Sequence, residues 1–288
     1  MTQPNAAQAA KADAPDPLGD DALLFIGNAT VLLRYAGFTV LTDPNFVHRG
    51  ESVPLGYGMS TTRLTDPAME IDELPPLDLV VVSHLHADHF DHIAEERLPR
   101  SMPIVTTHEA ASWLAERGFQ ALEPLETWEM HERRIPAGRL RLTAMPGRHA
   151  PAALQVALPD VMGSYLELWD GVAAATPGAD PTLRVYVSGD TLMYEGLREI
   201  PDRMPQIDLA LLHLGGTRVM GLTVTMDGEQ GRELLETLRP KLAVPIHYDD
   251  YEAFKSPLSE FVDEVERAGL RDTVRILERG DVLRLPIG

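Results

Sequence analysis

The stretch at positions 80–92, VVVSHLHADHFDH, decides the fold. It begins with three valines, and β-branched side chains fit the packed, pleated surface of a buried strand. The apolar run stops at a serine, and four side chains that can bind metals follow: His84, His86, Asp88 and His89. These side chains must lie at the carboxyl end of the strand, which is where ligands collect in layered α/β proteins.

The spacing of the four side chains indicates a site for two neighbouring ions. Residues two apart in an extended chain face the same way, so His84 and His86 can converge on one ion. Asp88 and His89 come after the chain has begun to turn, and they can reach a second ion. Such ligands suit zinc, and also manganese or iron. The alternative is a solvated, histidine-rich loop, but only 10 of 288 residues are histidine, so the cluster is rare by chance.

The composition is that of a globular protein with an acidic surface. Hydrophobic residues make up 44% and charged residues 24% of the chain, which allows a large core. No cysteine is present, so disulfides and thiolate ligands are excluded, and we expect a cytoplasmic location. The 44 acidic and 25 basic residues give a formal net charge of −19, which repels phosphate backbones and disfavours nucleic acid.

The sequence predicts one domain and no segment that crosses a membrane. No apolar run approaches the roughly 20 residues that span a bilayer. Residues 1–20, rich in Ala, Pro and Asp, are expected to form a disordered tail, and residues 21–288 a single domain. We expect a small-molecule substrate, and a homo-oligomer is compatible with the sequence.

Further predicted strands also end in residues that can bind metals. Apolar runs at 140–145, 183–187, 208–212 and 242–246 lead to His149, Asp190, His213 and His247. Packing alone does not explain why five separate strands end in this way, and together they match one two-metal centre. A strand over 38–41 runs into Asp43, which either supports a ligand from behind or forms an ordinary turn before Pro44.

Two other segments carry expectations about local structure. Residues 45–76 are rich in Pro and Gly and show no sustained period, so we expect a long loop that forms a wall or lid of the pocket. Its His48 and Tyr57 either touch substrate or lie on the surface, and the surface is favoured. Near the end of the chain, Ser256 and Pro257 are expected to start a helix that reaches residue 268.

With these residues assembled, the chain resembles the metallo-β-lactamase superfamily. Over residues 24–285 it resembles the branch of ascorbate-6-phosphate lactonases and N-acylphosphatidylethanolamine-hydrolysing phospholipase D enzymes. The motifs that carry the resemblance are LTDP at 41–44, SHLHADH at 83–89, His149, SGDT at 188–191 and PIH at 245–247. The resemblance implies an α/β (α+β) fold, a four-layer αβ/βα sandwich of metallo-β-lactamase type, with the metals at one edge.

By matching positions, the resemblance implies seven metal ligands. The first metal would be held by His84, His86 and His149. The second would be held by Asp88, His89 and His247. Asp190 would bridge the two metals, and Asp43 would support a ligand from behind.

Comparison with other branches of the superfamily narrows the type of reaction that we expect. His86 stands where the diiron, oxygen-reducing relatives carry glutamate, and Asp190 stands where some antibiotic-hydrolysing relatives carry cysteine. Seven ligands also exceed the set used by the single-iron sulfur dioxygenases. One departure is His213, where the phospholipase-like relatives commonly have an apolar residue or proline. It either contacts substrate or is a buried structural histidine, and we favour the second interpretation.

The resulting hypothesis is hydrolysis by a hydroxide that bridges two divalent ions, which we expect to be zinc. Asp88 would orient this hydroxide and take its proton, and Tyr194, His213 and Tyr248 are further candidates near the substrate. The expected substrate carries a lactone, an ester or a phosphodiester in a small soluble molecule. The alternatives are a hydrolase of an N-acyl phospholipid phosphodiester, an iron-dependent oxidoreductase of the same fold, and a non-catalytic metal-binding protein.

Overall fold

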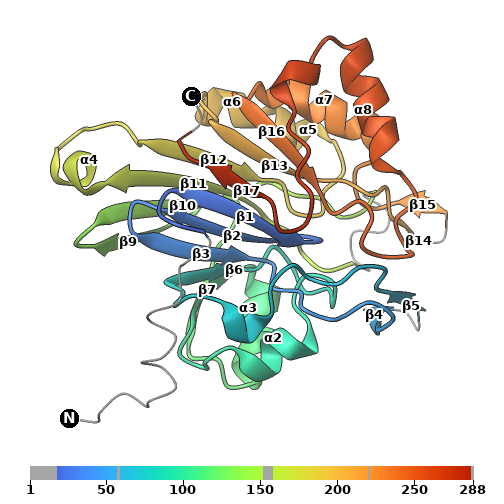
Figure 1. Ribbon diagram of the computed structural model, residues 1–288, viewed down its shortest axis with the longest axis horizontal. Helices are drawn as coiled ribbons and strands as arrows, with labels where there is room; N and C mark the ends of the chain where they lie inside the picture. The colour runs from blue at the N-terminus through green and yellow to red at the C-terminus, as the bar shows by residue number, and fades with distance from the viewer. Residues whose placement is uncertain (1–17, 57–58, 152–157, 220, 287–288) are drawn as a thin grey trace.

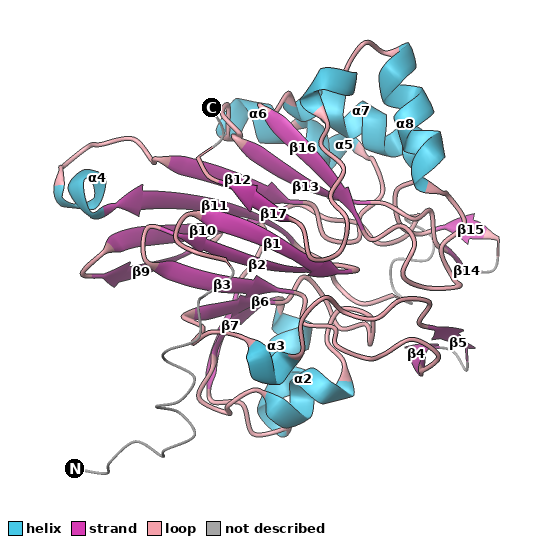
Figure 2. Cartoon of the chain, in the orientation of Figure 1, coloured by secondary structure: helices cyan, strands magenta, loops and turns pink. Residues whose placement is uncertain are grey.

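Two β-sheets lie face to face, and helices cover the outer surface of each (Figure 1). The computed structural model describes residues 18–56, 59–151, 158–219 and 221–286. Figure 2 shows the order of the layers, with both sheets enclosed between two groups of helices. The predicted four-layer sandwich with an α/β (α+β) fold is therefore confirmed.

The first sheet combines an antiparallel half with a parallel half. Its seven strands lie in the order β17 (Val282–Arg284), β1 (Ala22–Gly27), β2 (Thr30–Tyr35), β3 (Phe38–Thr42), β6 (Leu79–Val81), β7 (Pro103–Thr106) and β8 (Ala121–Pro124). Pairing is antiparallel from β17 to β3 and parallel from β3 to β8. Parallel neighbours need a crossover, and α2 (His92–Arg97) and α3 (His108–Glu116) supply the two crossovers that follow β6 and β7.

The second sheet is built in the same way. Its six strands lie in the order β16 (Leu242–Ile246), β13 (Leu209–His213), β12 (Leu183–Val187), β11 (Gly163–Asp170), β10 (Gly138–Met145) and β9 (Met130–Ile135). Pairing is antiparallel from β9 to β12 and parallel from β12 to β16. The crossovers contain α5 (Glu195–Arg198), α6 (Ile200–Arg203) and α7 (Gly228–Leu238), and α8 (Leu258–Arg267) follows β16.

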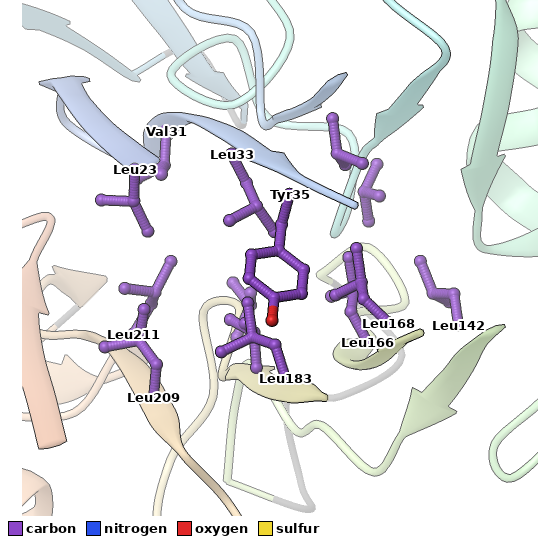
Figure 3. Close-up of a cluster of buried hydrophobic side chains, with 14 of the residues drawn as sticks. Leu23, Val31, Leu33, Tyr35, Leu142, Leu166, Leu168, Leu183, Leu209 and Leu211 are labelled. Atoms are coloured by element: carbon purple, nitrogen blue, oxygen red, sulfur yellow. The ribbon is translucent and has the colours of Figure 1, made fainter. Parts of the chain in front are cut away.

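The largest apolar core lies between the sheets. In Figure 3 the side chains of Leu23 and Val31 point toward those of Leu209 and Leu211 in the opposite sheet. The alternate residues of β1, such as Leu24, instead pack under α2 and α3. Because successive strand residues face opposite sides, a strand buried on both faces has a continuous hydrophobic sequence.

The carboxyl ends of the parallel strands meet at one end of the sandwich. Two hairpins lie at this end, at the right of Figure 1, and α4 (Gly171–Ala175) lies at the other end. One hairpin is formed by β4 (Ser52–Gly56) and β5 (Met59–Thr62), and the other by β14 (Arg218–Val219) and β15 (Leu222–Thr223). The remaining elements are the 3-10 helices η1 (Ile71–Glu73) and η3 (Arg271–Thr273).

Several local predictions differ from the structure. The tail was expected to reach residue 20, but Leu18 is buried and its carbonyl accepts a hydrogen bond from Arg284; residues 1–17 lie outside the described residues. The segment 45–76 is not a loop without secondary structure, because it contains β4, β5 and η1. Within this segment the side chain of Arg63 is fully buried, which does not suit a freely opening lid.

The helix predicted after Ser256 is present, but it begins one residue later than predicted, and Pro257 rather than Ser256 is its N-cap. α8 begins at Leu258, and no side chain caps it. The Ser256 hydroxyl instead accepts a hydrogen bond, 3.0 Å long, from the backbone N–H of Gly228, the first residue of α7. Tertiary packing therefore gave Ser256 a partner that local sequence could not indicate.

Candidate metal centre

The seven predicted ligands come together at the carboxyl ends of the strands. They form overlapping groups in which the candidate ligand atoms lie within 4.8 Å of one another. The loop after β6 carries four of them, and single residues follow β10, β12 and β16. These residues are far apart in the sequence, yet each of them follows an apolar strand that ends at one edge of its sheet.

Three imidazoles form the first half of the centre. The Nδ1 atom of His86 lies 3.0 Å from Nε2 of His84 and 3.1 Å from Nε2 of His149. Zinc–nitrogen bonds of about 2.0–2.1 Å in tetrahedral geometry place ligand nitrogens roughly 3.3 Å apart. The three nitrogens are therefore already close to the spacing that one zinc ion needs.

The second half of the centre contains carboxylates as well as imidazoles. The Oδ2 atom of Asp88 lies 3.4 Å from Nε2 of His247 and 3.9 Å from Nε2 of His89. The Oδ1 atom of Asp190 lies 3.5 Å from the same His89 nitrogen. The candidate ligand atoms of Asp190, His89 and His84 all lie within 4.8 Å of one another, so Asp190 lies between the two halves.

Three buried polar atoms of the centre have no hydrogen-bond partner. They are Oδ1 of Asp88, Nε2 of His89 and Oδ1 of Asp190. A buried polar atom without a partner is costly, so such atoms are rare unless something else binds them. Two of them, on His89 and Asp190, lie 3.5 Å apart, and all three belong to candidate ligands with oxygen or nitrogen donors, which fit divalent metal ions.

The other ring nitrogen of four histidines is held by a neighbour. These contacts run from His84 Nδ1 to Ser83 Oγ (3.0 Å), from His149 Nδ1 to the Val224 carbonyl (2.9 Å), from His247 Nδ1 to the Leu214 carbonyl (3.0 Å), and from His89 Nδ1 to Asp43 Oδ2 (3.2 Å). Such contacts fix the ring and leave Nε2 free for a metal. The contacts that orient the ligands of a metal site from behind are therefore present.

Asp43 and His213 form a buried pair behind the second half. Asp43 Oδ1 accepts a 2.7 Å hydrogen bond from the Ser83 backbone, and Oδ2 lies 3.5 Å from Nε2 of His213. His213 is fully buried, and its Nδ1 lies 3.2 Å from the Ser188 hydroxyl. His213 therefore contacts the residue that supports His89 and has no exposed surface to offer a substrate.

The two halves differ in their electrostatics. Burial, and then the charge of His149, lower the pKa of His86 to about 3, and burial also lowers the pKa of His84 and His149. Burial alone would lower the pKa of His89 and His247, but Asp190 and Asp88 raise both pKa values. The first half is thus a set of neutral imidazoles, whereas the second is a cluster of opposite charges.

Burial would also raise the pKa of both carboxyl groups, but neighbouring imidazoles reverse its effect. His89 and His247 hold the pKa of Asp88 below its usual range. The same two histidines hold the pKa of Asp190 well below its usual value. Both side chains are therefore carboxylates at neutral pH, which is the state that binds metals and accepts protons.

Two predicted tyrosines do not join the cluster. The ring of Tyr194 lies under the Arg148 guanidinium, 4.1 Å away, and covers Gly196. Tyr248 lines a cleft of about 820 Å³ with Leu277 and Arg279, and burial raises its pKa to about 12. Phe254, whose ring lies 4.4 Å from that of His247, lines the same cleft.

Of the two loop residues considered as possible substrate contacts, only His48 is among the described residues. His48 lies at the surface beside Asp66 and Glu70, as the favoured interpretation expected. Tyr57 lies outside the described residues.

Sequence reasoning missed several residues that hold the centre from behind. Thr225 donates a 2.9 Å hydrogen bond to Oδ2 of Asp190. The Asn28 amide donates to the backbone carbonyl of Asp88 at 2.6 Å, and the Asn45 amide donates to the carbonyl of Ala87 at 3.2 Å. Asn28 follows a strand in a Gly-Asn turn, and this pattern indicates only a turn, so no sequence signal marked its contact with the metal loop.

Fold and centre together define a metal-dependent hydrolase with a metallo-β-lactamase fold. A family model described as the β-lactamase superfamily domain matches residues 39–248, and the chain belongs to this superfamily. A UPF0173 metal-dependent hydrolase of Deinococcus radiodurans is 30% identical over 260 residues, which cover 90% of this chain and 97% of the relative. Another from Thermus thermophilus is 28% identical over 262 residues, covering 91% and 97%. The chain is thus a member of the UPF0173 metal-dependent hydrolases.

A solved structure has the same architecture. The isothiocyanate hydrolase from Delia radicum gut bacteria matches with a TM-score of 0.75 at 22% identity, covering 92% of this chain and all of the other, 100%. This likeness supports the fold alone. The narrower resemblance to ascorbate-6-phosphate lactonases and phospholipase D enzymes stays a prediction.

Among the helices of the described residues, none is long and apolar enough to cross a membrane.

Proposed function

We propose that this protein is a binuclear hydrolase that cleaves a lactone, an ester or a phosphodiester in a small soluble substrate. The observation that carries the proposal is the buried cluster of seven ligands, with unpartnered atoms on Asp88, His89 and Asp190. His84, His86 and His149 would hold one ion, Asp88, His89 and His247 a second, and Asp190 would lie between them. Two divalent ions, for which zinc and manganese are the candidates, would lower the pKa of a shared water and polarise the scissile bond.

Asp88 is the proposed general base, and its geometry and charge support this role. Its Oδ2 atom faces His247, whereas Oδ1 is buried without a hydrogen-bond partner. The low pKa of this group keeps it ionised, so it can orient an attacking water. A low pKa also makes it a weak base, so proton transfer to it would depend on ions that lower the pKa of that water. Asp190 is tied by Thr225 through its other oxygen, which fixes the carboxylate between the halves.

The test is a metal-dependence assay on a panel of lactones and simple phosphodiesters. The protein is stripped with a chelator and assayed before and after addition of zinc or manganese. We expect activity to return for the native chain and not for His86→Ala. Oxygen consumption with bound iron would instead favour the oxidoreductase, and cleavage of N-acyl phospholipid alone would move the substrate to a lipid. Metal binding without turnover on any of these substrates would favour the non-catalytic alternative.

A further inference from the structure

A fully buried ion pair lies behind the second half of the metal centre. Arg63 follows β5, and Asp250 follows β16; both side chains have 0% exposure, and Nη2 of Arg63 lies 3.2 Å from Oδ1 of Asp250. Replacing such a pair with apolar residues is often neutral or stabilising, so stability alone is a weak reason to keep it. Its contacts indicate a different role.

Asp250 connects to the metal ligands through Asn28. Oδ2 of Asp250 accepts a 2.9 Å hydrogen bond from the Asn28 backbone N–H. The Asn28 side chain then donates to the carbonyl of Asp88 at 2.6 Å, and the Asn28 carbonyl accepts from the His247 backbone at 3.1 Å. One residue therefore ties two ligands of the second half to the buried pair.

The backbone at these positions needs such restraint. Asn28 and His247 have φ angles of +53° and +62°, in the left-handed region that side chains other than glycine rarely adopt. Conformations of this kind persist only where surrounding contacts hold them, and they cluster at functional sites.

Arg63 connects to the same loop through Asn45. The Arg63 guanidinium and the Tyr251 hydroxyl both donate to Oδ1 of Asn45, the second at 2.9 Å. The Asn45 amide group donates to the carbonyl of Ala87 at 3.2 Å and lies 3.4 Å from Oδ2 of Asp91. The metal loop is thus held on both sides of Asp88 and His89.

Among the described residues, the hydrogen bonds of this network end on the backbones of Asp88 and His247 and on Ala87 and Asp91 of the same loop, and none reaches a first-half side chain. The His84 and His149 rings are held by the Ser83 hydroxyl, which also lies 3.4 Å from His89, and by the Val224 carbonyl. We propose that the Arg63–Asp250 pair, acting through Asn28 and Asn45, is a positioning device that sets the metal affinity of the second half and leaves the first half unaffected. This inference rests on the proposed two-metal centre.

The test is a titration of the metal-free, full-length protein with zinc in competition with a chromophoric chelator, so that two binding steps are resolved. Arg63→Met removes the closest charged partner of the buried Asp250, which then keeps Arg279, 3.5 Å away, and the Thr65 hydroxyl. This change can prevent folding, so two milder variants are used. Tyr251→Phe removes one hydroxyl from Asn45. Asn28→Gly removes the amide and tolerates the left-handed backbone. Tyr165→Phe is the control, because it removes a comparable hydroxyl contact, to the Gln206 carbonyl, on the opposite face of the second sheet.

We expect Tyr251→Phe and Asn28→Gly to weaken the second binding step about 10-fold to 100-fold while the first step stays unchanged. The control should leave both steps unchanged. Equal weakening of both steps, or no weakening in either variant, would overturn the positioning role. A native chain that binds one zinc only would overturn the two-metal proposal itself, and with it this inference, so the two failures are distinguishable.

Discussion

The two halves of the metal centre are built by different means. The first half brings together three imidazoles whose pKa values are lowered by burial, and its outer contacts are single ones, from His84 to the neighbouring Ser83 hydroxyl and from His149 to the Val224 carbonyl. The second half mixes imidazoles with carboxylates and is held by a buried network that joins segments up to 222 residues apart. The comparison teaches that the two halves differ in how much support lies behind them: single outer contacts hold the first half, whereas an extended buried network holds the second.

The largest expected effect comes from removing the residue between the halves. Asp190→Ala should reduce kcat/KM by about 10³-fold or more, because it removes a carboxylate on which charge stabilisation at both ions depends. Circular dichroism should show an unchanged fold. Near-normal turnover in this variant would contradict the two-metal account, because it would mean that the two halves do not act together.

The next effect concerns the proton acceptor. Asp88→Asn keeps the size of the side chain and removes its charge, so kcat should fall by about 10²-fold or more if Asp88 takes a proton from water. Metal content measured on the same sample separates this loss from loss of the second ion. A variant with normal metal content and normal kcat would rule out Asp88 as the base.

A smaller effect is expected from the support behind His89. His213→Leu keeps a buried side chain of similar size and removes the ring that contacts Asp43, so the second metal should bind about tenfold more weakly. His131→Gln is the matched control, because that histidine pairs with Glu123 away from the centre. Should the first binding step weaken instead, the assignment of His213 to the second half would be wrong.

The smallest effect is a difference in pH dependence. A raised pKa means that His89 and His247 take up protons at a higher pH than ordinary imidazoles, whose pKa is about 6.5. A proton competes with a metal for the same nitrogen, so the second ion should leave first as the pH falls. His86, with a pKa of about 3, stays neutral far longer. Metal content measured by dialysis at stepwise lower pH checks this order, and loss of the first-half ion before the second would contradict it.

Much of the fold follows from local sequence. Hydrophobic runs located the long central strands, and the range predicted for β12 coincides with the structure. The strand β8 was missed, because its residues Ala-Leu-Glu-Pro show little β-propensity and are only half-buried. The hairpin of β4 and β5 was read as part of a long loop, because Pro54 and Gly56 within it are residues typical of loops.

The candidate ligands could be proposed from sequence because each follows an apolar strand. The network behind them could not, since Arg63 lies in a segment without periodicity and Asp250 is the second of two successive aspartates. Nothing local distinguishes a buried charge from a solvated one. Only the pairing of distant segments shows that these two residues share one site.

The most direct test of the two-metal account is the metal content of the purified protein, measured by elemental mass spectrometry without added metal. The account predicts about two equivalents of zinc or manganese per chain. About one equivalent of iron would contradict it, and the assignment of Asp88, His89 and His247 to a second ion would then have to be withdrawn.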